Sequence, residues 1–259
     1  MGDKGREVRI GVVGVGERGY GQMLTLLDMP DVRVAAVCDV YPDRVEHAQK
    51  GAAEKQGFKP DGYDDYRELN RRDDIEAVVI MTSWQTHSLI AVDAMLCGKY
   101  AAMEVGGAAS VEECWQLVRT SEKTGKPCML LENCCYGLEE MTLLNMVRQG
   151  LFGELVHCQG GYLHDLRDQI GKGDILRHYR QDNFLSRNGE LYPTHELGPI
   201  AKYLNLNRGN RMLALTSMAS KAAGMKAWFR EHRPDSPLAG RQFNQGDIVT
   251  TMIYCANGE

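Results

Sequence analysis

This sequence has little of several features that would each indicate a particular class of protein. Basic residues are not in excess, since 30 Lys and Arg stand against 35 Asp and Glu, for a net charge of −5. Without a basic excess the chain lacks the electrostatic footprint of a nucleic-acid-binding protein, and we expect no nucleic-acid partner. No apolar run reaches the roughly 20 residues that cross a bilayer, so we also expect no membrane span.

The eight cysteines lack the spacing of a metal site. No CxxC pair and no Cys/His cluster has zinc spacing, so no metal is expected. The cysteines are scattered through apolar segments, which is typical of buried free thiols in a reducing compartment. Residues 1–7 do not resemble an export signal, so the sequence as written is expected to be cytoplasmic, although a removed signal would leave no trace.

The order of apolar and polar segments indicates two domains, residues 1–135 and 136–259. In the first, short buried strands alternate with amphipathic helices, which predicts an α/β fold with a doubly wound parallel sheet, a Rossmann domain. The second is expected to be an α+β domain with an open, mainly antiparallel sheet and a polar, irregular segment at 165–188. Its longer strand-like runs are 154–164, 211–218 and 247–255.

The last of these runs lacks a return strand. Residues 247–255 are β-branched, and Asn257-Gly258 behind them is a strong hairpin-turn pattern. We therefore expect the natural sheet to continue past Glu259. We also expect the chain to form a homo-oligomer through this second-domain sheet.

The most informative segment is a glycine-rich turn. Gly14, Gly16 and Gly19 form a G-x-G-x-x-G pattern between an apolar run and a helical pattern. In a dinucleotide site the first glycine permits a tight turn, the second lets the backbone approach a pyrophosphate, and the third lets helix and strand pack closely. The positive end of the helix then faces the phosphates. The alternative is a glycine-rich turn in an ordinary α/β protein.

An acidic residue stands where this kind of site needs one. Asp39 ends the next apolar run, about 20 residues beyond the glycines. Its carboxylate can accept hydrogen bonds from both adenosine-ribose hydroxyls, and its charge would repel a 2′-phosphate. The pattern therefore favours NAD over NADP as the cofactor.

Polar and aromatic residues follow the later strands, where functional groups gather in such sheets. Trp84 and His87, within Ser83-Trp84-Gln85-Thr86-His87, would lie along the cofactor, or the segment is a helix cap with a packed aromatic. Glu104 would bind the nicotinamide ribose, or it is a solvated strand end. Asn133 would bond a ribose or carboxamide, or it is a turn residue.

The second domain supplies groups that can move protons near neutral pH. These are Tyr162 with His164 and Tyr192 with His195. His195 alternatively caps the helix expected at 196–204. Arg180 adds a donor for a hydroxyl or carbonyl, or it belongs to a solvated basic face.

Taken together, these segments resemble the Gfo/Idh/MocA oxidoreductase family, and most closely its glycoside hydrolase family 109 type, the NAD-dependent α-N-acetylgalactosaminidases. The resemblance covers nearly all of residues 8–259. Three positions depart from it: Gly106 stands where Pro usually follows Glu-Val, Gln85 where Glu is common, and Glu196 where Gly usually follows the histidine. The matching stretches include Gly14–Gly19, Ser83–His87, Leu131–Gly137, Gly161–Arg167 and Tyr192–His195.

The resemblance implies roles for particular residues. Tyr162 and His195 would be the acid/base candidates. A sugar site would be formed by Tyr162, Arg180, Tyr192, Pro193, Thr194 and His195. Contacts with NAD would come from Glu17, Arg18, Asp39, Trp84, Gln85, Thr86, His87, Glu104, Val105, Asn133 and Tyr192.

The implied activity is cleavage of a small-molecule glycoside by oxidation at C3, elimination, addition of water and reduction. Enzymes of this kind are an exception to the usual pair of carboxylates in glycosidases. One alternative is an NAD-dependent sugar or cyclitol dehydrogenase. Another is a catalytically silent NAD-binding sugar sensor, for which Glu196 is one sign. The sequence leaves the sugar and the aglycone open.

Overall fold

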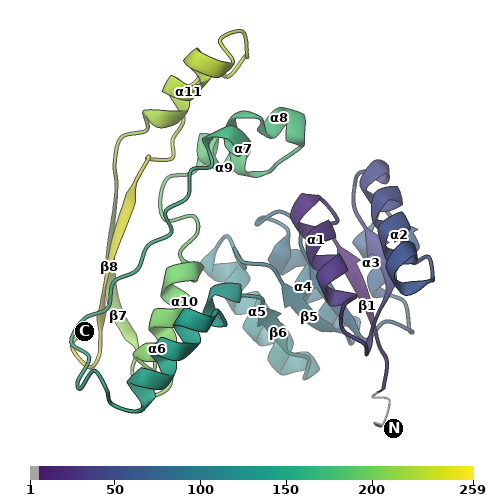
Figure 1. Cartoon of the computed structure of the whole chain (residues 1–259), viewed down its shortest axis with the longest axis horizontal. Helices are drawn as coiled ribbons and strands as arrows, with labels where there is room; N and C mark the ends of the chain where they lie inside the picture. Colours follow the sequence, from purple (N-terminus) through teal and green to yellow (C-terminus); the bar gives the residue numbers. More distant parts are fainter. Residues whose placement is uncertain (1–5) are drawn as a thin grey trace. The chain divides into compact units, whose positions relative to one another are not determined.

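The computed structural model describes residues 6–259, which divide into two compact units after Leu131. Each unit is described by itself (Figure 1). Within the described residues, no helix is both long enough and apolar enough to span a membrane.

The N-terminal unit is built on a parallel six-stranded sheet with the strand order β3-β2-β1-β4-β5-β6. This order places two mononucleotide-binding halves side by side, with the switch point between β1 and β4. The predicted doubly wound parallel sheet is confirmed. Its strands are β1 (Val8–Val13), β2 (Val32–Cys38), β3 (Asp61–Tyr63), β4 (Ala77–Ile80), β5 (Tyr100–Met103) and β6 (Cys128–Leu130).

Helices cover both faces of this sheet because the strands are apolar on both sides. Side chains of α1 and α2 pack on one face, around Met23 and Ala48. Side chains of α3 and α4 pack on the other, and α5 lies against α4. The helices are α1 (Glu17–Leu26), α2 (Pro42–Gln56), α3 (Tyr66–Asn70), α4 (His87–Leu96) and α5 (Val111–Thr124).

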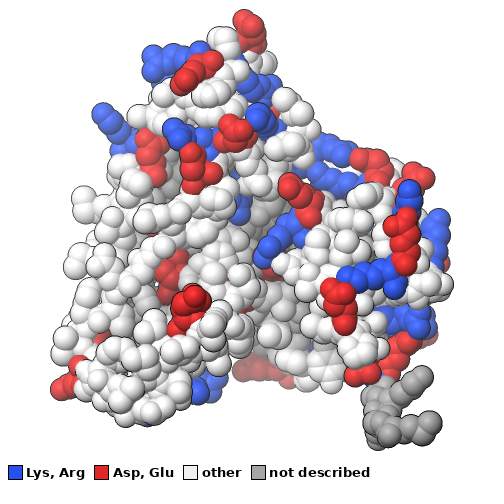
Figure 2. Space-filling view, viewed as in Figure 1, with Lys and Arg blue, Asp and Glu red and all other residues white. Residues whose placement is uncertain are grey.

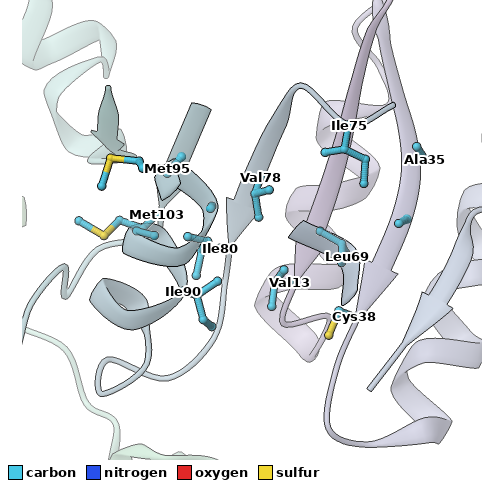
Figure 3. Packing of buried hydrophobic residues seen from close by; sticks show 14 residues of the cluster. Val13, Ala35, Cys38, Leu69, Ile75, Val78, Ile80, Ile90, Met95 and Met103 are labelled. Atoms are coloured by element: carbon cyan, nitrogen blue, oxygen red, sulfur yellow. The ribbon is translucent and has the colours of Figure 1, made fainter. Parts of the chain in front are cut away.

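Figure 3 shows how the second of these faces is filled. Val13, Val78 and Ile80 project from neighbouring strands, and Leu69 and Ile90 meet them from the helices. All five are nearly or fully buried. This packing holds the carboxyl ends of β1 and β4 rigidly, and the predicted cofactor residues stand at those ends.

The C-terminal unit combines helices with an antiparallel pair of strands, β7 with β8. It therefore has the predicted α+β character with an antiparallel sheet. Its elements are the 3₁₀ turn η1 (Asn133–Cys135), α6 (Leu138–Arg148), α7 (Arg167–Gly171), α8 (Gly173–Leu176), α9 (Arg180–Ser186), α10 (Thr194–Tyr203), β7 (Met212–Ala219), α11 (Gly224–His232) and β8 (Val249–Cys255).

Two secondary-structure predictions in this unit are wrong. Residues 154–164 form no strand: the backbone pairs with neither β7 nor β8, which pair with each other, and only Leu155 and Cys158 pack on the core. The segment 165–188 is not irregular, since it contains α7, α8 and α9. Helix α7 forms there because Ile170 is buried against Trp228 and Phe229 of α11, a contact far away in sequence.

Two smaller predictions also need correction. The helix expected at 196–204 begins two residues earlier, at Thr194, so His195 lies within its first turn and not before it. Pro193 already has helical backbone angles, with φ −77° and ψ −11°, which suits the start of a helix. All eight cysteines are free, but only Cys38, Cys135 and Cys255 are buried, four others are half-buried, and Cys114 is exposed on α5.

Candidate functional site

The glycine-rich turn has a geometry that only glycine satisfies at two of its positions. Gly14 has φ +86°, and a Cβ added there would lie 2.7 Å from the backbone of Met81 and Thr82. A Cβ on Gly19 would lie 2.0 Å from the carbonyl oxygen of Gly14. The turn is thus wedged against the end of β4, and α1 packs directly on it.

This turn fits a dinucleotide pyrophosphate. Helix α1 begins at Glu17, and its N-cap, Gly16, has no side chain to bond the first backbone N–H groups. Those N–H groups and the positive end of the helix dipole form an anion site. Glu17 and Arg18 are exposed at this end of the helix.

Asp39 ties β2 to the same turn. The carboxylate is 7% exposed. It accepts hydrogen bonds from the backbone N–H groups of Val15, at 2.9 Å, and Tyr41, at 3.1 Å. The Arg44 guanidinium lies 4.0 Å away and would be 3.2 Å from a Cβ on Gly16. Sequence reasoning missed Arg44, because a basic residue in a polar helix equally fits a solvated face.

Trp84 and Gly106 pack against each other at the ends of β4 and β5. Trp84 is 3% exposed. Gly106 has φ +104°, and a Cβ there would lie 2.0 Å from Cδ1 of the indole. Proline fixes φ near −65°, so Gly106 holds a backbone conformation that proline, the residue expected here from the resemblance, cannot adopt. Beside it, Glu104 pairs with Arg18 at 3.5 Å, and Val105 is buried.

The segment before α4 splits into exposed and buried residues. Gln85 is exposed, and the Thr86 hydroxyl donates to the Thr82 hydroxyl at 2.8 Å. His87 has no exposed surface, its Nε2 lies 3.1 Å from the Thr82 carbonyl oxygen, and burial lowers its pKa to about 4. Its buried Nδ1 has no partner among residues 6–259. A contact between His87 and NAD remains a prediction. Because the imidazole has no exposed surface, this contact would require the ring to become accessible to the cofactor.

A compact aromatic cluster occupies the C-terminal unit. The ring centroids of Tyr162 and Tyr192 lie 4.8 Å apart, those of Tyr192 and His195 4.8 Å, and those of Tyr162 and His195 5.3 Å. The Arg180 guanidinium sits 5.1 Å from the centre of the Tyr192 ring. The structure therefore brings four of the predicted sugar-site residues together from three separate segments. Pro193 and Thr194 begin α10 beside them.

Each acid/base candidate has a hydrogen-bond partner. The Tyr162 hydroxyl lies 2.6 Å from Nδ1 of His164, whose ring is exposed. His195 Nδ1 lies 2.6 Å from Oε1 of Glu132. Sequence reasoning did not connect Glu132 with His195, because 63 residues separate them.

Glu132, at the start of η1, is buried together with its carboxylate. Burial opposes its ionisation, but the hydrogen bonds that it accepts hold its pKa below the ordinary value. One of them comes from the backbone N–H of Cys134, at 2.9 Å.

Glu132, Cys134 and His195 also place possible ligand atoms within 4.8 Å of one another. A metal would need a thiolate, and burial together with the Glu132 charge raises the pKa of Cys134 above its ordinary value. The 2.6 Å separation between the imidazole and the carboxylate is that of a charge-assisted hydrogen bond. We therefore interpret the group as a hydrogen-bonded pair.

Glu196, which departs from the family pattern, lies in the same turn of α10 as His195. A Cβ on Gly160 would be 2.8 Å from the Glu196 Cβ, so the first side-chain atom of Glu196 lies against the segment that leads to Tyr162. Burial raises the pKa of its carboxyl group above the ordinary value.

Residue Asn133 is exposed at the first position of η1, in the C-terminal unit. Its contact with the cofactor stays a prediction. The other cofactor contacts that the resemblance implies also stay predictions, namely those of Glu17, Arg18, Asp39, Trp84, Gln85, Thr86, Glu104, Val105 and Tyr192.

Comparison with known proteins gives a family to each unit. Residues 8–131 match the oxidoreductase family with an NAD-binding Rossmann fold, Gfo/Idh/MocA. Residues 136–259 match the C-terminal domain of glycosyl hydrolase 109. Similar curated proteins include the α-N-acetylgalactosaminidase of Shewanella oneidensis, 42% identical over 97% of this chain and 56% of that protein. The α-N-acetylgalactosaminidase of Bacteroides fragilis is 41% identical over 97% of this chain and 61% of that protein.

Solved structures show the same fold at low identity. The scyllo-inositol dehydrogenase of Lactobacillus casei with bound NAD(H) and scyllo-inositol superposes with a TM-score of 0.71, at 14% identity over 98% of this chain and 67% of that one. The myo-inositol 2-dehydrogenase of Lactobacillus plantarum gives 0.74, at 14% identity over 98% and 68%.

This chain spans little more than half the length of the curated relatives. The two matched regions follow each other with four residues between them, 132–135. The chain therefore belongs to the Gfo/Idh/MocA oxidoreductase family, with an NAD-binding Rossmann domain followed by a glycosyl hydrolase 109 C-terminal domain.

Proposed function

We propose that this protein is an NAD-dependent glycosidase that cleaves α-N-acetylgalactosaminides or related glycosides. The observation that carries the proposal is the cluster of Tyr162, Tyr192, His195 and Arg180. It combines side chains whose chemistry allows proton transfer with a cation, in a domain of the glycosyl hydrolase 109 type, and this combination supports the proposal. Its relatives named α-N-acetylgalactosaminidase support the choice of substrate.

The N-terminal domain would hold NAD through residues already in place. The glycine turn and the start of α1 receive the pyrophosphate, and Asp39 receives the adenosine ribose while its charge disfavours NADP. When bound there, NAD⁺ would supply the redox chemistry, a reversible hydride transfer with C3 of the sugar.

The residues of the C-terminal domain would move the protons. Oxidation at C3 also requires a base to take the proton of the C3 hydroxyl group, and a proton returns to that oxygen when C3 is reduced again. With C3 a ketone, the hydrogen on C2 is acidic, and Tyr162 or His195 removes it as the bond between C1 and the aglycone oxygen breaks. The aglycone oxygen takes up a proton. Water then adds to C1 and a proton returns to C2. Tyr162, paired with His164, and His195, paired with Glu132, can each accept a proton and pass it on.

The exposed sheet suggests a homo-oligomer. Every residue of β7 is exposed, including Leu215 and Met218, and β8 exposes Met252 and Tyr254. Figure 2 shows few charged side chains over the part of the C-terminal unit that contains β7 and β8. An apolar sheet surface of this kind favours association with a second copy.

The test is a screen of p-nitrophenyl glycosides together with a measurement of cofactor balance. A glycosidase releases nitrophenol over many turnovers while the enzyme's NAD content and redox state stay constant. A sugar or cyclitol dehydrogenase would instead consume NAD in proportion to the product. Binding of NAD without reaction of any glycoside would indicate a catalytically silent sugar sensor, the alternative for which Glu196 is one sign.

A further inference from the structure

The strongest unassigned feature is the contact between Glu132 and His195. Glu132 extends from the start of η1, and His195 lies in the first turn of α10. Oε1 of the carboxylate is 2.6 Å from Nδ1 of the imidazole. The side chain of Glu132 is 7% exposed and that of His195 is 16% exposed, so bulk water screens this contact very little.

The chemistry of the pair fixes which ring nitrogen carries the proton. An ionised carboxylate only accepts hydrogen bonds. His195 Nδ1 must therefore be the donor, which leaves the lone pair of the neutral ring on Nε2. A second bond, from the Cys134 N–H to the same Oε1, keeps the carboxylate in this position.

The local fold brings η1 and α10 very close together. Gly198, one helical turn beyond His195, lies against Glu132 and Cys135. A Cβ at Gly198 would be 2.8 Å from Cys135 Sγ and 3.1 Å from Glu132 Cγ. A larger residue at this position would push α10 away from η1 and lengthen the contact between the carboxylate and the imidazole.

We propose that Glu132 is a positioning residue that holds His195 in the Nδ1–H form, with Nε2 ready to take a proton. This inference rests on the proposed function, in which His195 serves as an acid or base. The negative charge of Glu132 also stabilises the imidazolium that forms when Nε2 is protonated, as a carboxylate does in a Ser-His-Asp triad.

Other groups also face the histidine. Tyr162 and Tyr192 contact the ring, and the carboxyl group of Glu196, which itself interacts with Glu190, lies close enough to interact with the histidine. Among the acidic residues that the structure describes, only Glu132 hydrogen-bonds to the imidazole. The test therefore has to separate a direct bond from a general effect of negative charge.

The experiment compares the protein with Glu132→Gln, Gly198→Ala and Glu139→Gln. Glu139 is exposed on α6 and serves as the matched control. ¹⁵N NMR of the histidine side chains should show His195 with a protonated Nδ1 in the unmodified protein and in Glu139→Gln. Glu132→Gln should give a mixture of the two tautomers. It should also lower kcat about 10²–10⁴-fold, with KM changing only a few-fold, and Gly198→Ala should show a smaller change in the same direction.

The proposal is overturned if His195 carries its proton on Nε2 in the unmodified protein, if its tautomer is unchanged in Glu132→Gln, or if kcat is unchanged in that variant. One equivalent of tightly bound zinc, removed by Glu132→Gln, would also overturn it. Circular dichroism and thermal unfolding check that each variant folds. If no glycoside is cleaved, the proposed function fails, but the NMR result still decides whether Glu132 fixes the tautomer of His195.

Discussion

Replacing Gly106 with alanine should destabilise the N-terminal domain and weaken cofactor binding. The residue follows Glu104 and Val105 at the end of β5 and has φ +104°. An alanine there pays about 1–3 kcal/mol for a sparsely populated backbone conformation. Its Cβ would also lie 2.0 Å from Cδ1 of the buried Trp84, and overpacking of this kind costs about 1–3 kcal/mol.

Together these costs amount to about 2–6 kcal/mol, a large part of the 5–15 kcal/mol that stabilises a typical domain. Urea unfolding measures the loss, and calorimetric titration with NAD measures the affinity. The matched control is Gly98→Ala, because Gly98 has φ +78° but open space around its Cβ position. That variant should lose only the stability that corresponds to the unfavourable backbone conformation.

The difference between the two alanine variants isolates the contact with Trp84. Gly106→Pro, which introduces the residue expected from the resemblance, should be at least as damaging, because proline cannot reach this φ. The reasoning is refuted if Gly106→Ala costs no more than Gly98→Ala, or if Gly106→Pro stabilises the protein.

Three further outcomes are expected. Asp39→Ala should lower the free energy of unfolding by about 1–3 kcal/mol, because the Val15 and Tyr41 N–H groups lose their acceptor. It should also weaken NAD binding in titration. The control is Asp73→Ala at an exposed position, and equal unfolding free energies and NAD affinities for the two variants would contradict the role of Asp39. Burial lowers the pKa of His87 from 6.5 to about 4, so the unfolded state binds more protons between these values. The unfolding free energy should therefore fall by up to about 1.4 kcal/mol per pH unit below pH 6.5, and His87→Gln should lack this component of the slope; an identical pH profile would exclude it. Tyr162→Phe should reduce glycoside cleavage about 10²–10⁴-fold while NAD stays bound, and near-normal turnover would return Tyr162 to a packing role.

The Rossmann domain could be predicted because its determinants are local. The strand, the three glycines and the start of α1 lie within one short segment, and Asp39 ends the very next strand. Alternation of buried strands with helices then implied a parallel sheet, which the structure has. Arg44 was missed because nothing local distinguishes a cation beside the glycine turn from one facing solvent.

The C-terminal domain was harder to predict because its determinants are distant contacts. Helix α7 depends on Trp228, whose indole N–H donates to Asp168 across 60 residues of sequence. The extended segment 154–164 has a strand-like pattern, yet a strand needs a hydrogen-bonding neighbour, and β7 and β8 pair with each other. The tyrosines and His195 could be chosen as candidates for proton transfer from their residue types, whereas the link from Glu132 to His195 requires the fold.

The most direct test of the central claim follows the hydrogen at C2 of the sugar. The protein is incubated with a reactive glycoside in D₂O, and the released sugar is analysed by NMR and mass spectrometry. Oxidation at C3 followed by elimination requires that the C2 proton be removed and later replaced from solvent. The account therefore predicts one deuterium at C2 in product that has undergone no net oxidation. Product with its original hydrogen at C2 would contradict the account and indicate direct displacement at C1.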